Sequence, residues 1–150
     1  MKIGTAVPLP AYNIDPAFMA KKAEDLGFDS IWYAEHPAVP VHSDSPFPST
    51  GGEIPWTYSH FTDPYIALAR ASAVTSDIKL GTGITLVPER NPLLLAKEIA
   101  TVDFLSGGRM LPAVGLGTNS PGEFEAVGVN IKERAGRTDE AISLMRALIR

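Results

Sequence analysis

Residues Lys79 to Gly117 carry the strongest fold signal of the chain, KLGTGITLVPERNPLLLAKEIATVDFLSGGRMLPAVGLG. The segment 78–87 mixes β-branched residues with glycine and is too short for a helix, so it predicts a buried strand. Asn91-Pro92 predicts a helix start, because the Asn side chain caps the helix and proline tolerates its first position. Gly107-Gly108 predicts the end of that helix, and residues 109–116 follow as a second strand. The segment is therefore a strand–helix–strand unit.

The same pattern recurs along the rest of the chain, with further helix starts at Asp15-Pro16 and Asp63-Pro64. The sequence predicts strands at 2–7, 28–34, 78–87 and 109–116, and helices at 15–26, 63–76, 91–106 and 133–150. Strands that alternate with helices pair in parallel, with right-handed crossovers. Four such units are half of a (β/α)8 barrel, whose usual size is ~250 residues.

We therefore expect an α/β fold of the (β/α)8 TIM-barrel type. Residues 1–150 would form the N-terminal half of a single barrel domain, with an insertion or lid at about 37–62. The final residues TDEAISLMRALIR are strongly helical and contain no stop signal, which favours this interpretation. A complete four-stranded doubly wound domain is the alternative.

The composition narrows the class of partner. The net charge is −4 and no basic run occurs, which argues against nucleic acid. Cysteine is absent, so neither a disulfide framework nor a thiolate metal site is possible, and the three histidines are not spaced as metal ligands. The N-terminus has too short an apolar run for a signal peptide, and no membrane-length segment follows. We expect a cytoplasmic protein that acts on a small molecule, without metal, nucleic acid or membrane.

The long loop after the second predicted strand is a candidate lid. It runs from Glu35 to Thr62 and is rich in proline, and long loops without secondary structure are usually functional or disordered. Its aromatic residues Phe47, Trp56, Tyr58 and Phe61 would be unnecessary in a solvated linker. An inert insertion or an oligomer contact is the alternative.

Strand ends supply the candidate site residues, because active sites of such barrels lie at the carboxyl ends of the strands. His36 is a candidate general acid or base, or a structural histidine that supports the lid. Glu35 either accepts an N–H group of a cofactor or pairs with a neighbouring cation. Glu89 and Arg90 either pair with each other on the surface or line the pocket, and we favour the exposed pair.

Glycines mark two further positions. Gly81-Thr82-Gly83 interrupts a strand, which indicates a bulge or a close approach of a flat ring, or else room for neighbouring side chains. The segment 115–120, GLGTNS, lacks the third glycine of the dinucleotide fingerprint because Ser120 takes its place. Its glycines let the strand end pass close to a ligand, and Asn119 and Ser120 are either hydrogen-bonding groups or turn formers.

Longer motifs resemble a known family. They are FDSIWYAEH, SDSPFPSTGGEIPW, IKLGTGITLVPERNPLLLAKEIATVDFLSGGRM, GLGTNSPGEFEAVGV and ERAGRTDEAI. Together they resemble the luciferase-like monooxygenase and deazaflavin-dependent reductase superfamily, and within it the probable coenzyme F420-dependent oxidoreductases. The resemblance covers essentially the whole chain and implies a (β/α)8 barrel with insertions.

The resemblance also implies roles for residues. A bulge with a non-prolyl cis peptide, which backs the cofactor ring, would fall at Gly83-Ile84. His36 would be the catalytic acid or base near the reactive ring carbon. The implied cofactor-binding residues are Glu35, Thr82, Gly83, Ile84, Gly117, Thr118, Asn119 and Ser120. Some deazaflavin sugar-phosphate dehydrogenases of the superfamily carry a glutamate acid after the fourth strand; the matching position is Ser120, which puts that mechanism in doubt.

The implied function is hydride transfer between coenzyme F420 and a small organic substrate. An FMN-dependent luciferase-like monooxygenase is the alternative enzyme, and a non-catalytic flavin- or deazaflavin-binding protein is the alternative of another class. We expect the full-length protein to be a homodimer.

Overall fold

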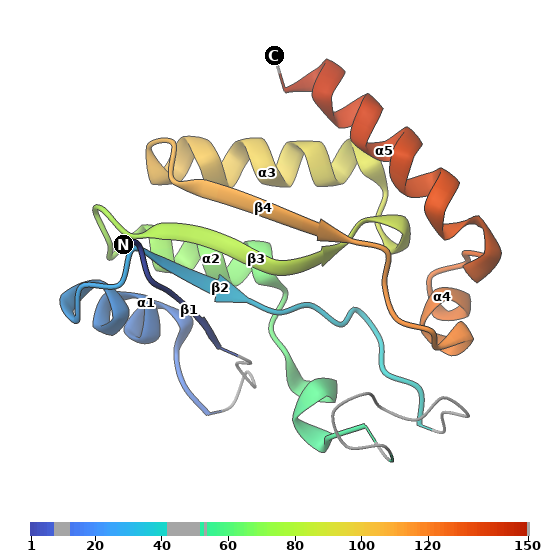
Figure 1. The fold of residues 1–150 in the computed structure, drawn as a ribbon, viewed down its shortest axis with the longest axis horizontal. Helices are drawn as coiled ribbons and strands as arrows, with labels where there is room; N and C mark the ends of the chain where they lie inside the picture. Colours follow the sequence, from blue (N-terminus) through green and yellow to red (C-terminus); the bar gives the residue numbers. More distant parts are fainter. Residues whose placement is uncertain (8–12, 42–51, 53, 150) are drawn as a thin grey trace.

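The computed structural model describes residues 1–7, 13–41, 52 and 54–149. These residues form one four-stranded parallel sheet with strand order β1-β2-β3-β4 (Figure 1). The strands are β1 (Gly4–Val7), β2 (Ser30–Tyr33), β3 (Lys79–Leu86) and β4 (Met110–Gly115). Each predicted strand is confirmed, with ends that lie within two residues of the predicted bounds.

Helices cover one face of the sheet. They are α1 (Pro16–Asp25), α2 (Pro64–Ser72) and α3 (Pro92–Ser106), with α5 (Arg134–Leu148) packed on α3. The short α4 (Pro121–Ala126) lies beyond the end of β4 (Figure 1). Consecutive crossover helices pack side by side, α1 on α2, α2 on α3 and α3 on α5 (Figure 1). This neighbour-to-neighbour order follows from the right-handed crossovers of parallel strands. None of these helices has the length and apolar character needed to span a membrane.

The predicted helix starts have the expected caps. The Asp15 side chain accepts from the N–H of Ala17, and Asp63 and Asn91 each accept from two N–H groups of the first helical turn. Gly107 ends α3 in the left-handed conformation, with φ 68°, which is accessible to glycine without a Cβ penalty. Local sequence therefore sets where these helices begin and where α3 ends.

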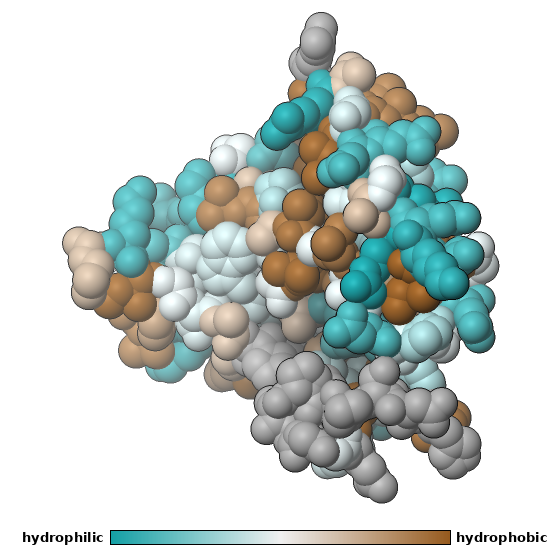
Figure 2. Space-filling model, turned by 45° about the vertical axis from the view of Figure 1, so that its right-hand side comes forward, coloured by the Kyte–Doolittle hydropathy of each residue, from teal (hydrophilic) through white to brown (hydrophobic). Residues whose placement is uncertain are grey.

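The two faces of the sheet differ. Ile31, Leu80 and Met110 are register neighbours and are buried beneath the helices. One residue further along, Trp32, Gly81 and Leu111 occupy the opposite face, because successive side chains of a strand alternate. Leu111 is exposed there, and a Cβ on Gly81 would overlap the Trp32 ring. Figure 2 shows apolar side chains exposed beside a strongly hydrophilic surface.

The connection between β2 and α2 contains a 3₁₀ helix, Trp56–His60, which the sequence did not predict. Residues 42–51 and 53 of the predicted lid, with Phe47, lie outside the described residues, so the lid stays a prediction. Between β4 and α5 the structure adds α4 and a 3₁₀ turn, Ile131–Glu133. These additions matter because α4 supplies a residue of the candidate site.

Candidate functional site

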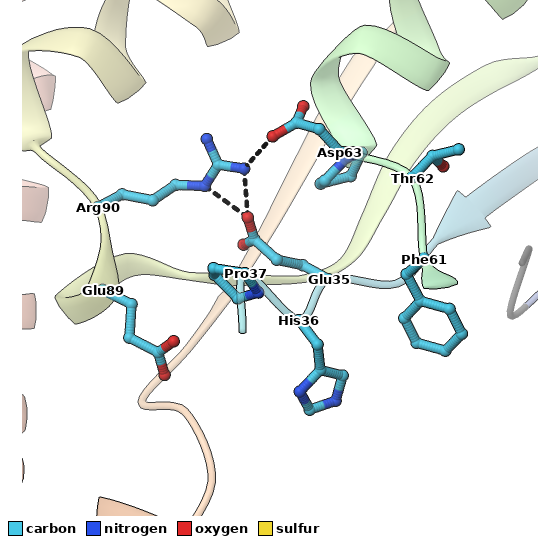
Figure 3. Close-up of a pocket in the computed structure, with 9 residues that line it drawn as sticks. Glu35, His36, Pro37, Phe61, Thr62, Asp63, Glu89 and Arg90 are labelled. Atoms are coloured by element: carbon cyan, nitrogen blue, oxygen red, sulfur yellow. Dashed lines mark hydrogen bonds and ion pairs between the residues drawn. The ribbon is translucent and has the colours of Figure 1, made fainter. Parts of the chain in front are cut away.

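The candidate site lies at the carboxyl-terminal edge of the sheet, beyond β2, β3 and β4. A pocket of about 360 Å³ opens there. It is lined by Glu35, His36, Pro37, Phe61, Thr62, Asp63, Pro64, Glu89 and Arg90 (Figure 3). The pocket therefore joins the end of β2, the start of α2 and the turn after β3.

Glu35 is held on both carboxylate oxygens. The backbone N–H of Leu86 donates to Oε2 at 2.7 Å, and Nε of Arg90 donates to Oε1 at 2.5 Å (Figure 3). Arg90 also bonds Asp63 at 2.6 Å and Glu98 at 2.9 Å. The buried Glu35 carboxylate thus ties the end of β2 to the end of β3, and Arg90 extends the tie to α2 and α3.

His36 turns away from this network and meets α4. Its Nδ1 lies 3.1 Å from Oε1 of Glu123, whose side chain is only 2% exposed. The Thr118 hydroxyl donates to the other oxygen of Glu123 at 2.7 Å. With Glu123 as a carboxylate, which only accepts, Nδ1 of His36 is the donor in this contact and Nε2 takes no part in it. Glu123 fixes the tautomer and orientation of His36.

Aromatic rings enclose His36 on its other side. The ring centroids of Tyr58 and Phe61 lie 5.0 Å and 5.9 Å from that of His36, and 4.7 Å from each other. These rings come from the candidate lid segment. They give the imidazole an apolar wall that restricts its contact with water.

The predicted irregularity of β3 is confirmed. The register with β4 shifts between Thr82 and Thr85, and the Gly83-Ile84 peptide bond is cis. The Thr82 hydroxyl fills the gap in the ladder: it donates to the carbonyl of Ala113 at 2.9 Å and accepts from its N–H at 3.1 Å. Thr82 is fully buried, whereas Gly83 and Ile84 are exposed.

The segment after β4 is also well connected. Gly117 has φ 83°, and a Cβ there would lie 2.7 Å from Oε1 of Glu89. Arg134 of α5 donates to the carbonyl of Thr118 and to Oδ1 of Asn119, each at 3.1 Å. Ser120 is buried at the start of α4. Thr118 is the residue of this segment that reaches His36, through Glu123.

The prediction of an exposed Glu89–Arg90 pair is wrong. Glu89 is 7% exposed and, among the described residues, neither of its carboxylate oxygens has a hydrogen-bond partner. Burial raises the pKa of Glu89 to about 7, with Glu123 and Glu35 adding to the shift and His36 opposing it. The two neighbours in sequence point apart because Arg90 turns to Glu35 (Figure 3).

Sequence reasoning missed one acidic residue of the site, Glu123, and placed Glu89 in the pocket only as the less favoured alternative. The contact between His36 and Glu123 spans 87 positions of sequence, so no local pattern indicates it. The available signal was position, because both residues follow the carboxyl end of a strand. No group of three or more histidine or carboxylate side chains in the described part of the chain is arranged to hold a metal ion.

Comparison with known proteins identifies the family to which the chain belongs. Residues 12–150 match the family profile described as luciferase-like monooxygenase. The chain belongs to this family. Its members are oxidoreductases and monooxygenases, so the family assignment agrees with the resemblance found in the sequence.

Two relatives illustrate the range of the family. An uncharacterised protein of Mycobacterium tuberculosis is 41% identical over 138 residues, which are 91% of this chain and 49% of that protein. The 5,10-methylenetetrahydromethanopterin reductase of Methanolobus tindarius is 30% identical over 133 residues, 89% of this chain and 33% of that protein. The chain thus spans about half the length, or less, of these relatives.

Solved structures share the fold. A monooxygenase of Streptomyces bottropensis matches with TM-score 0.75 and 30% identity over 99% of this chain and 43% of its own. The coenzyme F420-dependent tetrahydromethanopterin reductase of Methanopyrus kandleri matches with TM-score 0.61 and 26% identity over 93% and 38%. The FMN-bound oxygenating constituent of 3,6-diketocamphane monooxygenase of Pseudomonas putida matches with TM-score 0.77 and 19% identity over 99% and 39%. The four described strands fit part of a luciferase-like TIM barrel.

Proposed function

We propose that the full-length protein is an oxidoreductase that transfers a hydride between coenzyme F420 and a small organic substrate. His36 is its acid–base residue. The observation that carries this proposal is the contact between Nδ1 of His36 and the buried Glu123, at the carboxyl edge of a parallel sheet. A histidine held in this way presents its other ring nitrogen, Nε2, to a substrate as a general acid or base.

The His36–Glu123 pair resembles the oriented histidines of other acid–base sites in its physical logic. Glu123 accepts from Nδ1, Thr118 fixes Glu123 in turn, and the rings of Tyr58 and Phe61 limit water around the imidazole. His36 would give a proton to, or take one from, the substrate atom next to the carbon that receives or loses the hydride. The carboxylate stabilises the imidazolium that forms when His36 takes up a proton.

The β3 bulge fits a flat cofactor ring. Gly83 exposes its main chain without a side chain, and Ile84 is 41% exposed beside it. Gly83 and Ile84 would back the ring, and Thr118, Asn119 and Ser120 would contact its polar edge. When bound, a deazaflavin supplies or accepts the hydride.

Three other predicted binding residues support this arrangement through contacts within the protein. Glu35 and Thr82 use their polar atoms within the protein, where they hold β3 against β2 and β4. Gly117 lets the loop after β4 pass over Glu89. We propose that these residues act by fixing the shape of the rim.

The choice of F420 over FMN rests on the relatives. The M. tindarius and M. kandleri proteins are named as a methylenetetrahydromethanopterin reductase and an F420-dependent reductase. The S. bottropensis protein, named as a monooxygenase, supports the second candidate, an FMN-dependent monooxygenase. A binding protein without turnover is the third.

Titration of the full-length protein with oxidised F420 and, separately, with FMN distinguishes these candidates. We expect saturable binding of F420 at micromolar concentration and much weaker binding of FMN. Reduced F420 should then be reoxidised without oxygen when small planar aldehydes, ketones or enones are added. Oxygen-dependent turnover with reduced FMN alone would establish the monooxygenase instead. Binding of F420 without turnover across the panel would favour the binding protein.

A further inference from the structure

Glu89 is a buried carboxyl group that the proposed chemistry leaves without a role. It ends the 3₁₀ turn Val87–Glu89, is 7% exposed, and lines the same pocket as His36 (Figure 3). Neither of its oxygens has a hydrogen-bond partner among the described residues. A buried polar group in this condition calls for an explanation, because leaving it unpaired destabilises the fold.

The surroundings of Glu89 favour its neutral form. The loop after β4 closes over the carboxyl group, since Oε1 lies 2.7 Å from the position of a Cβ on Gly117. Two other carboxylates, Glu123 and Glu35, raise its pKa further, and only His36 opposes them. Like charges this close in a buried site cannot all ionise together without a large penalty.

The nearby cations are engaged elsewhere. Arg90 binds Glu35, Asp63 and Glu98. From α5, which packs on the turn, Arg137 donates to the carbonyl of Pro88 at 3.4 Å and Arg134 donates to the loop after β4. Glu35 is thus paired with Arg90, and Glu123 contacts Nδ1 of His36 and the Thr118 hydroxyl, whereas Glu89 has no hydrogen-bond partner among the described residues.

We propose that Glu89 is the proton reserve of His36: it holds a proton as a carboxylic acid and passes it to His36 after His36 has given up its own. This inference rests on the proposed acid–base role of His36. In the step, the O–H bond of Glu89 breaks and an N–H bond forms at Nε2 of His36. A neutral acid and a neutral imidazole become a carboxylate and an imidazolium, so the net charge of the site is unchanged.

The proposed path of the proton is the pocket that Glu89 and His36 both line. Its volume of about 360 Å³ is large enough for several water molecules. Glu89 therefore acts through His36 as a positioning residue, without touching the substrate. Since each turnover moves one proton in or out of a partly enclosed site, a second group that titrates near neutrality restores the protonation state of His36.

Infrared difference spectroscopy of the full-length, cofactor-free protein tests the reserve directly. Between pH 5 and pH 9 we expect a carboxylic acid C=O band that disappears with a midpoint near the pKa of about 7. Glu89→Gln should abolish the band, and the matched variant Glu125→Gln, at an exposed position of α4, should keep it. A band that survives in Glu89→Gln overturns the proposal.

His36→Asn tests the coupling between the two residues without any cofactor. Because His36 opposes the upward shift of the Glu89 pKa, its removal should move the band midpoint to higher pH. An unchanged midpoint overturns the coupling.

With cofactor and substrate, Glu89→Gln should remove the limb of the pH–rate profile near neutrality, while the KM for the substrate stays within about twofold. An unchanged profile overturns the relay. Absence of turnover in the wild type, with the infrared results as expected, would instead count against the proposed function and leave the Glu89–His36 coupling established.

Discussion

The two edges of the sheet differ in how completely their buried charged groups are hydrogen-bonded. At the amino-terminal edge Arg109 is 7% exposed, and all three of its side-chain nitrogens donate to neighbouring oxygens. Beside it, Glu24 accepts from the N–H groups of Ser76, Asp77 and Ile78 at 2.8–3.1 Å. Both of these charged groups are satisfied by hydrogen bonds within the protein.

The carboxyl-terminal edge contains side chains whose hydrogen-bonding groups are not all used. There Glu89 has no hydrogen-bond partner among the described residues, and His36 uses one nitrogen on Glu123. In α/β barrels the amino-terminal face contributes stability and the carboxyl-terminal face carries the chemistry. Glu35 and Glu123 at this edge are hydrogen-bonded, so the contrast between the two edges lies in Glu89, the group to which we assign a role in proton exchange.

The largest effect is expected for the removal of Arg109 at the amino-terminal edge of the sheet. Arg109→Met should lower the free energy of unfolding by about 4 kcal/mol, because buried main-chain carbonyls lose their donors. Urea unfolding monitored by circular dichroism measures it. The control Arg146→Met, at an exposed position of α5, should change stability by less than about 0.5 kcal/mol. Equal stability of the two variants would show that the Arg109 network is dispensable.

The next largest effect is expected on turnover, for the substitution of His36 at the carboxyl-terminal edge. His36→Asn should slow turnover by about a hundredfold, within the ~10²–10⁴-fold range of general acid–base groups, while cofactor affinity is kept. Steady-state kinetics and cofactor titration of the full-length protein measure both. Wild-type turnover in this variant would remove His36 from the mechanism.

A smaller effect is expected for Glu89, whose substitution should raise the free energy of unfolding at alkaline pH. The folded state holds a proton on Glu89 up to a pKa of about 7, whereas the unfolded chain releases it near 4.5. Stability therefore falls as the pH rises through this interval and stays lower above it. Glu89→Gln should be more stable than the wild type by about 2 kcal/mol at pH 8 and equal to it at pH 4. Thermal unfolding at both pH values measures this, and a loss of stability at pH 8 would contradict it.

The smallest effect is expected on stability, for the substitution of Glu24 at the amino-terminal edge. Desolvation opposes the ionisation of Glu24, yet its three backbone N–H partners and Lys21 lower the pKa to about 2 from 4.5. Its stabilisation is therefore present above pH 4.5 and is lost as the pH falls towards 2. Glu24→Gln should cost about 1 kcal/mol at pH 7 and less at pH 3. The exposed control Glu140→Gln should show no such difference.

Much of the fold could be predicted from short-range patterns. Asp15, Asp63 and Asn91 cap the helices that their Asx-Pro pairs predicted, because a cap needs only neighbouring backbone groups. The bulge and the cis bond at Gly83-Ile84 were implied by the family resemblance and are present. The helix α4 was not predicted, because six residues give too few turns for a periodic pattern.

The candidate site was predicted in position and only partly in composition. His36 lies where strand-end reasoning placed it, and Thr118 reaches it through Glu123. The partner of Arg90 could not be predicted, since Glu35 is 55 positions away and the adjacent Glu89 was the simpler choice. Binding of a cofactor by the residues of this rim stays a prediction.

The sequence by itself determined the order of strands and helices, their caps and the glycine-rich course of β3, because each depends on the chemistry of neighbouring residues. Only the tertiary structure decided which charges are paired. Glu35 pairs with Arg90, His36 contacts Glu123, and Glu89 lies beneath the loop after β4 with no hydrogen-bond partner in the part of the chain that the structure describes. The physical reason is that parallel crossovers bring distant strand ends to one edge, where burial and geometry select each partner.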